Sequence, residues 1–145
     1  MASPGRIAQL WFVRASAVAL MWGTLLAPAP VQADPVGECQ TTTTTQVDTN
    51  QCLQNTQAAA QHVLDLALQR AQQKADSLDG VTGRTEARPA LDQSQADWKT
   101  LVNSNCAVRG AFAAGASGSG QFIAACAIQM TRLRAEELDA LSTGA

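Results

Sequence analysis

Few residues in this chain have catalytic potential, and none of them falls in a familiar catalytic pattern. A Ser or Cys nucleophile needs a base beside it, but His62 is the single histidine and has no Ser or Cys motif nearby. The acidic pairs Glu136–Glu137 and Asp76/Asp79 fall at expected helix ends among other charges. We expect these carboxylates to be solvated rather than to act as the acid and base of a glycosidase. The sequence therefore predicts a protein that is not an enzyme.

Metal and cofactor sites are not expected either. The cysteines are far apart and His62 has no companion histidine, so the spacing does not suit a zinc site. The Gly/Ser-rich segment 115–120 lacks the following lysine and the preceding strand of a phosphate-binding loop. We predict no metal and no cofactor.

The first 33 residues have the pattern of a secretory signal peptide. Arg6 and Arg14 provide the positive region, and residues 15–27 form a thirteen-residue apolar run. As a helix this run would span about 20 Å, short of a hydrocarbon core of about 30 Å. We predict cleavage after Ala33 and a periplasmic or secreted protein. Glu38 stands where a lipobox before Cys39 would need a small residue, so no lipid anchor is expected.

Composition indicates one globular domain. The chain has 145 residues, of which 46% are hydrophobic and 15% charged, which excludes disorder of the whole chain. Its net charge of −2 becomes −4 when Arg6 and Arg14 leave with the signal peptide. Because no basic surface remains, nucleic acid is not an expected partner.

The rest of the chain shows helical periodicity and no strand-like alternation. We predict an extended, mobile, Thr-rich lead-in over residues 34–45 and a helical domain over 46–142. Helices are expected at about 46–78, from Pro89 to about Cys106, and from about Phe122 onward, with a flexible connection from Gly110 to Gly120. The apolar stripe of the third helix is expected to hold Phe122, Ile123, Cys126, Met130, Leu133, Leu138 and Leu141. The predicted fold class is all-α, a small three-helix bundle.

The four cysteines are expected to form two disulfides, because their number is even and the exported chain has few aromatic residues for a core. An up-down-up bundle places Cys52, Cys106 and Cys126 at one end, and Cys39 can fold back to reach it. Three pairings are therefore possible. We favour Cys39–Cys52 and Cys106–Cys126, since each closes a short irregular segment.

Four patches of sequence follow one another in order. The first two are the segment 48–52, Asp-Thr-Asn-Gln-Cys, and Gln95 with Trp98 ahead of Cys106. The last two are the Gly/Ser-rich segment before Cys126 and the set Met130, Thr131, Arg134 and Leu138. Together they resemble the lysozyme inhibitor LprI-like family of exported bacterial domains, whose first signature is acid-Met-Asn-any-Cys. The resemblance covers residues 38–142 and implies a helical, disulfide-bonded, periplasmic or secreted module that binds and inhibits lysozyme.

Several positions depart from the family pattern. Thr49 stands where the family usually has Met, and Leu101–Val102 replace a Tyr-Arg pair. Along the first helix, polar and aromatic residues of the family are replaced by Thr56, Ala60 and Leu64. The cysteines and their spacing thus match the family pattern better than the residues expected on the surface do.

The motif residues are expected to have framework roles; they are Asn50, Gln95, Trp98, Thr131 and Arg134. Asn50 is expected to cap a helix or bond the backbone, and Trp98 to fill the centre of the bundle.

Arg109 is the candidate for partner binding. Lysozyme is cationic and its cleft contains carboxylates, so an acidic inhibitor with one inserted cation would suit it. We expect the segment 107–121, tethered by Cys106 and Cys126, to be the recognition element. The alternative is a structural or accessory cell-envelope protein that binds a wall component or another exported protein.

Overall fold

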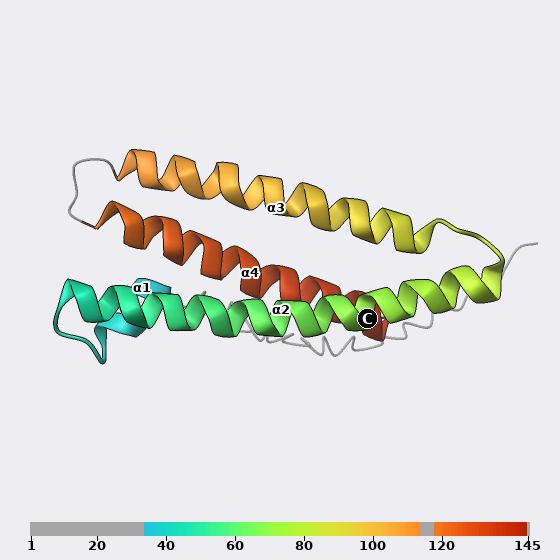
Figure 1. The fold of residues 1–145 in the computed structure, drawn as a ribbon, viewed down its shortest axis with the longest axis horizontal. Helices are drawn as coiled ribbons and strands as arrows, with labels where there is room; N and C mark the ends of the chain where they lie inside the picture. Colours follow the sequence, from blue (N-terminus) through green and yellow to red (C-terminus); the bar gives the residue numbers. More distant parts are fainter. Residues whose placement is uncertain (1–33, 114–117, 145) are drawn as a thin grey trace, which may run out of the picture. The chain divides into compact units, whose positions relative to one another are not determined.

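In a computed structural model, residues 34–113 and 118–144 form four helices. They are α1 (Pro35–Gln40), α2 (Gln46–Thr82), α3 (Ala87–Phe112) and α4 (Ser119–Thr143). α2 and α4 run side by side in one direction, and α3 runs back in the other (Figure 1). No strand occurs in these ranges, so the all-α prediction is confirmed, with one short helix added. The predicted signal peptide and its cleavage site lie outside the described residues.

The segment predicted to be an extended lead-in instead begins with α1. Asp34 caps this helix by accepting a hydrogen bond from the Val36 amide at 3.2 Å, and Pro35 occupies the first turn, where its missing N–H costs nothing. The hydroxyls of Thr41 and Thr43 donate to carbonyl oxygens of the last turn. These threonines therefore close the C-terminal end of α1. The buried Cys39, bonded to Cys52, holds α1 against α2.

α2 continues past Asp79–Gly80, where the sequence predicts its end. It begins at the N-cap Thr45, whose hydroxyl accepts from the Asp48 amide, and ends at Gly83, whose φ of +66° favours glycine. The Asp79 carboxylate accepts from the amides of Glu86, Ala87 and Arg88 at 2.9–3.1 Å. Asp79 is thus the cap of α3 rather than a stop for α2.

The connection predicted from Gly110 to Gly120 is much shorter, because α3 extends to Phe112 and α4 begins at Ser119. Gly110 is buried within α3, and a Cβ on it would lie 2.5 Å from the Ile123 side chain. Glycine here permits the close approach of α3 to α4 rather than flexibility.

Both favoured disulfides are present, Cys39–Cys52 and Cys106–Cys126, with Cα–Cα distances of 5.8 and 5.5 Å. The first joins α1 to α2, and the second joins α3 to α4. The prediction of their pairing is confirmed.

The core lies mainly between α2 and α4 and is rich in alanine, which lets the two helices approach closely. Its fully buried large residues are Leu53, Leu64, Ile128 and Leu138. Trp98, predicted to fill the centre, instead packs at the side of the cluster around Leu64 and is only partly buried. The predicted stripe of the third helix is wrong in part, because Phe122, Ile123, Leu133 and Leu141 are exposed.

None of the helices in the described ranges is both long and apolar enough to cross a membrane.

Candidate functional site

A buried polar contact connects two of the motif residues, Gln95 and Arg134. The Arg134 side chain is 5% exposed, and its Nε donates to Gln95 Oε1 at 3.0 Å. Its other nitrogens donate to Ser94 Oγ at 2.9 Å and Glu137 Oε2 at 2.8 Å. A buried guanidinium needs such acceptors. The contacts with Gln95 and Ser94 fix α3 against α4, whereas the Glu137 contact lies within α4.

The other motif residues lie apart from this contact. Thr131 is buried on α4. Asn50 is exposed inside α2 rather than at its cap, and its Oδ1 accepts from Gln121 Nε2 at 3.0 Å. Asn50 thus joins α2 to α4 through its side chain. The prediction that Asn50 caps a helix is wrong, because Thr45 is the N-cap of α2.

An exposed apolar surface lies where α3 ends and α4 begins, beside the Cys106–Cys126 disulfide. Phe112 is 90% exposed and Phe122 49% exposed. Together with Arg109 they line a shallow cavity of about 510 Å³ that extends to Asp34. We call Arg109, Phe112 and Phe122 the end surface. Arg109 belongs to the last turn of α3 and not to a loop, so the prediction of a loop recognition element over 107–121 is wrong in this part.

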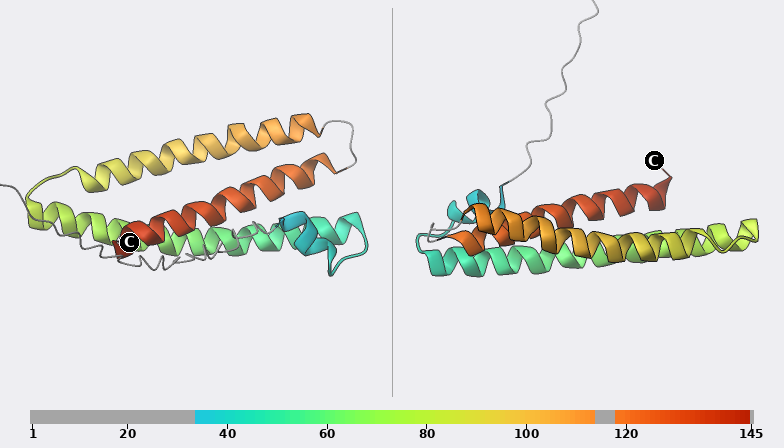
Figure 2. Two further views of the ribbon diagram at one scale, coloured as in Figure 1. Left: turned by 180° about the vertical axis from the view of Figure 1, so that it is seen from behind. Right: turned by 90° about the horizontal axis from the view of Figure 1, so that it is seen from above.

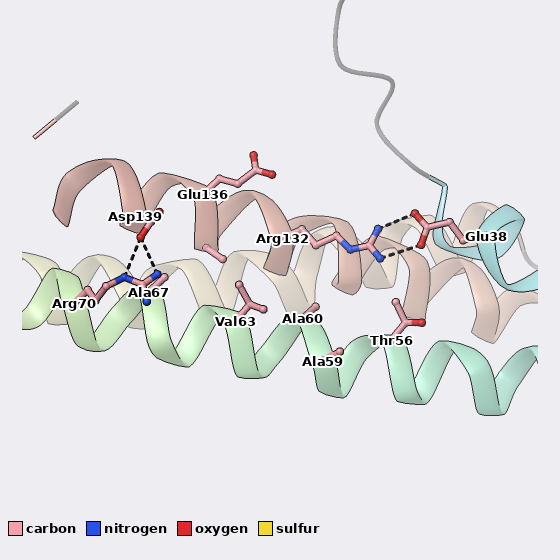
Figure 3. Close-up of a pocket in the computed structure, with 11 residues that line it drawn as sticks. Glu38, Thr56, Ala59, Ala60, Val63, Ala67, Arg70, Arg132, Glu136 and Asp139 are labelled. Atoms are coloured by element: carbon pink, nitrogen blue, oxygen red, sulfur yellow. Dashed lines mark hydrogen bonds and ion pairs between the residues drawn. The ribbon is translucent and has the colours of Figure 1, made fainter. Parts of the chain in front are cut away.

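A second cavity, which the sequence analysis missed, lies between α2 and α4 (Figure 3). Its volume is about 480 Å³, and alanines and Val63 line its apolar part. Two ion pairs bound it: Arg132 binds both oxygens of Glu38 at 2.9–3.0 Å, and Arg70 binds Asp139 at 2.7 Å. No motif marks these pairs, because their partners are 94 and 69 residues apart.

The Arg132–Glu38 contact holds α1 on α4. The hydrogen bond from Arg132 is the main cause that lowers the pKa of Glu38, and the same bond raises the pKa of Arg132. Since both side chains are more than a third exposed, water screens much of this attraction.

The candidate catalytic residues do not form a site in the described ranges. His62 is exposed on α2. Glu137 binds Arg134, Asp76 binds Arg88, and Asp79 caps α3. All four cysteines are disulfide-bonded, and within the described residues no cluster of three acidic, His or Cys residues could hold a metal.

The described residues thus form a small all-helical domain with two disulfides and with exposed cavities on its surface. The family model described as "Lysozyme inhibitor LprI" matches residues 38–138. The chain belongs to this lysozyme inhibitor family. No curated protein and no solved structure matches it.

Proposed function

We propose that this protein is exported and that it binds and inhibits lysozyme without catalysing a reaction itself. The observation that carries the proposal is the family match, which spans all four cysteines and the contact between Gln95 and Arg134. The two disulfides also suit an oxidising compartment.

Charge supports this choice of partner. The chain after residue 33 holds twelve acidic residues and eight basic ones, whereas lysozyme is cationic. Opposite net charges accelerate encounter and give a binding rate that depends on salt. We therefore expect association to slow as ionic strength rises from about 0.01 to 0.15 M, because the Debye length falls from about 30 to 8 Å.

The end surface is the contact surface that we favour. Exposed aromatic residues and arginine are the residue types that dominate protein interfaces, and Phe112 projects almost fully into solvent. Lysozyme hydrolyses glycosidic bonds with a pair of carboxyl groups. In our proposal Phe112 and Phe122 bury against the rim of the cleft, and Arg109 faces those carboxyl groups.

The test measures direct binding of lysozyme by calorimetry, together with lysis of cell walls. Phe112→Ala should weaken binding by about 30-fold, the effect of losing a contact of about 2 kcal/mol. Arg109→Gln should weaken binding and inhibition together. The control is Val81→Ala, which removes a 79% exposed apolar residue from the opposite end of α2.

Two results would count against the proposal. Absence of any binding by the oxidised protein would reject lysozyme as the partner. Equal affinity of Phe112→Ala and Val81→Ala would reject the end surface and leave lysozyme as partner through another face.

A further inference from the structure

A groove runs between α2 and α3, with α4 as its floor. It consists of two adjoining cavities of about 400 and 350 Å³. The two cavities share Gln57 of α2, Val102 and Asn103 of α3, and Ala127 of α4. This groove is separate from the end surface and from the cavity of Figure 3.

α3 is bonded to α4 at both ends of the groove. The hydrogen bond from Arg134 to Gln95 anchors α3 on one side of it, and the Cys106–Cys126 disulfide anchors α3 on the other. Between Gln95 and Cys106 the helix rises about 16 Å, and none of its residues in this span is fully buried. In Figure 1 and in the left view of Figure 2, α4 lies between α3 and α2. The length suits an elongated ligand.

The lining is amide-rich and almost uncharged. The side-chain amides come from Gln57, Gln61 and Asn103, and the aromatic residue is the partly buried Trp98. Lys99 is the one charged residue among those that the structure describes along the groove. By contrast, the cavity of Figure 3 is bounded by two ion pairs.

This chemistry favours a carbohydrate over a peptide. An amide both donates and accepts hydrogen bonds, as a sugar hydroxyl does, and the amide residues Gln57 and Asn103 are exposed and line both cavities. The indole of Trp98 can pack on the apolar face of a sugar ring. A helical wall offers no free strand edge for the main-chain pairing that holds extended peptides.

We propose that this groove binds a glycan chain of uncharged, N-acetylated sugars. The apolar side chains of Val102 on α3 and Ala127 on α4 line the groove together with the amides of Gln57 and Asn103. The apolar side chains can receive the methyl of an acetamide while the amides bind its polar atoms. The proposal does not depend on lysozyme binding. If both are correct, one molecule binds lysozyme and a glycan at different surfaces.

The test titrates chitotetraose, the tetramer of N-acetylglucosamine, into the full chain carrying Trp11→Phe and Trp22→Phe. Trp98 is then the sole tryptophan, and the chain has no tyrosine, so fluorescence reports directly on the groove. We expect a saturable change with chitotetraose and none with cellotetraose, which has the same linkage without acetamides. Absence of saturation at about 10 mM chitotetraose, where even a site with a Kd of about 1 mM is filled, would overturn the proposal. An equal response to cellotetraose would do the same.

Variants locate the binding in the groove. Gln57→Ala and Asn103→Ala should each weaken chitotetraose binding roughly three- to tenfold, the effect of one lost neutral hydrogen bond. The matched control is Gln73→Ala, an exposed glutamine of α2 that does not line the groove. If all three variants bind equally, the groove is not the site.

A comparison with lysozyme binding separates this proposal from the previous one. Gln57→Ala should bind lysozyme normally in the absence of glycan, and Phe112→Ala should bind chitotetraose normally. Loss of chitotetraose binding in Phe112→Ala would place the glycan at the end surface and reject the groove. Saturation by chitotetraose in a protein that fails to bind lysozyme would support the groove and reject only the lysozyme proposal.

Discussion

At the scale of single residues, the polar motif positions act through contacts between helices. Gln95 and Arg134 are 39 positions apart in the chain, yet they form a buried hydrogen bond. A buried guanidinium stays charged, so each acceptor that it loses exposes an unpaired donor to a poorly hydrated interior. The motif positions Gln95 and Arg134 thus form one contact between α3 and α4.

This pair gives the first prediction. Gln95→Leu keeps the apolar bulk of the side chain but removes the acceptor from Arg134, and should lower the free energy of unfolding by about 1.5–3 kcal/mol. Urea unfolding followed by circular dichroism measures the change. The control is Gln93→Leu on the same helix, where the glutamine is exposed and bonded only to Asp97.

A double-mutant cycle tests whether the loss belongs to the contact. If the effects of Gln95→Leu and Arg134→Met simply add, the two side chains are not coupled and the assignment is wrong.

At the scale of elements, the start of α3 depends on a cap that a residue of α2 supplies. Asp79 lies in the last turn of α2 and caps the start of α3, whose first residues carry no acid of their own. Hydrogen bonds from the backbone amides of Arg88 and Ala87 are the main cause that lowers the pKa of Asp79 below its usual value of 3.8. The turn between α2 and α3 therefore depends on an ionised carboxylate.

The second prediction is a pH dependence. Because the folded protein lowers the pKa of Asp79, its ionised form stabilises the fold above pH 3.8, and this stabilisation is lost as the pH falls through the lowered pKa. Asp79→Ala should be less stable than the original chain at pH 7, and the difference should shrink below about pH 4. Thermal unfolding of both proteins across this range measures it.

Asp79→Asn is the matched variant, since it keeps one acceptor oxygen without the charge, and its stability at neutral pH should lie between the other two. A constant difference between Asp79→Ala and the original chain at all pH values would show that the charge of Asp79 has no part in the cap.

At the scale of the whole molecule, the core is small and the disulfides supplement it. Many core positions on α2 are alanines, each of which buries little apolar area. The two disulfides join cysteines 13 and 20 positions apart in the sequence. Each should stabilise the fold by about 3 kcal/mol if its effect is the chain entropy that it removes from the unfolded state.

The third prediction follows from this dependence. The variants Cys39→Ala/Cys52→Ala and Cys106→Ala/Cys126→Ala should each lower the free energy of unfolding by about 3 kcal/mol. Reduction of both disulfides should remove about twice as much, a large part of the 5–15 kcal/mol typical of a folded domain. Urea unfolding with and without reductant provides the measurement. An unchanged urea midpoint after complete reduction would contradict it.

The sequence by itself determined the helical class, the approximate course of the three long helices and the number of disulfides. These features follow from local periodicity, turn residues and an even cysteine count, all of which act over short stretches of chain. Family membership was also predictable, because the spacing of the motifs is a property of the sequence.

Only the tertiary structure decided α1, the ends of α2 and α3, and the surfaces available for binding. Cys39 is buried and bonded to Cys52, which holds the short helix α1 against α2, while the threonines 41–45 that follow it stay outside the helix. The pairs Arg134–Gln95 and Arg132–Glu38 join residues 39 and 94 positions apart. Local propensity cannot report such contacts, because their free energy arises only when the helices pack and water leaves the space between them.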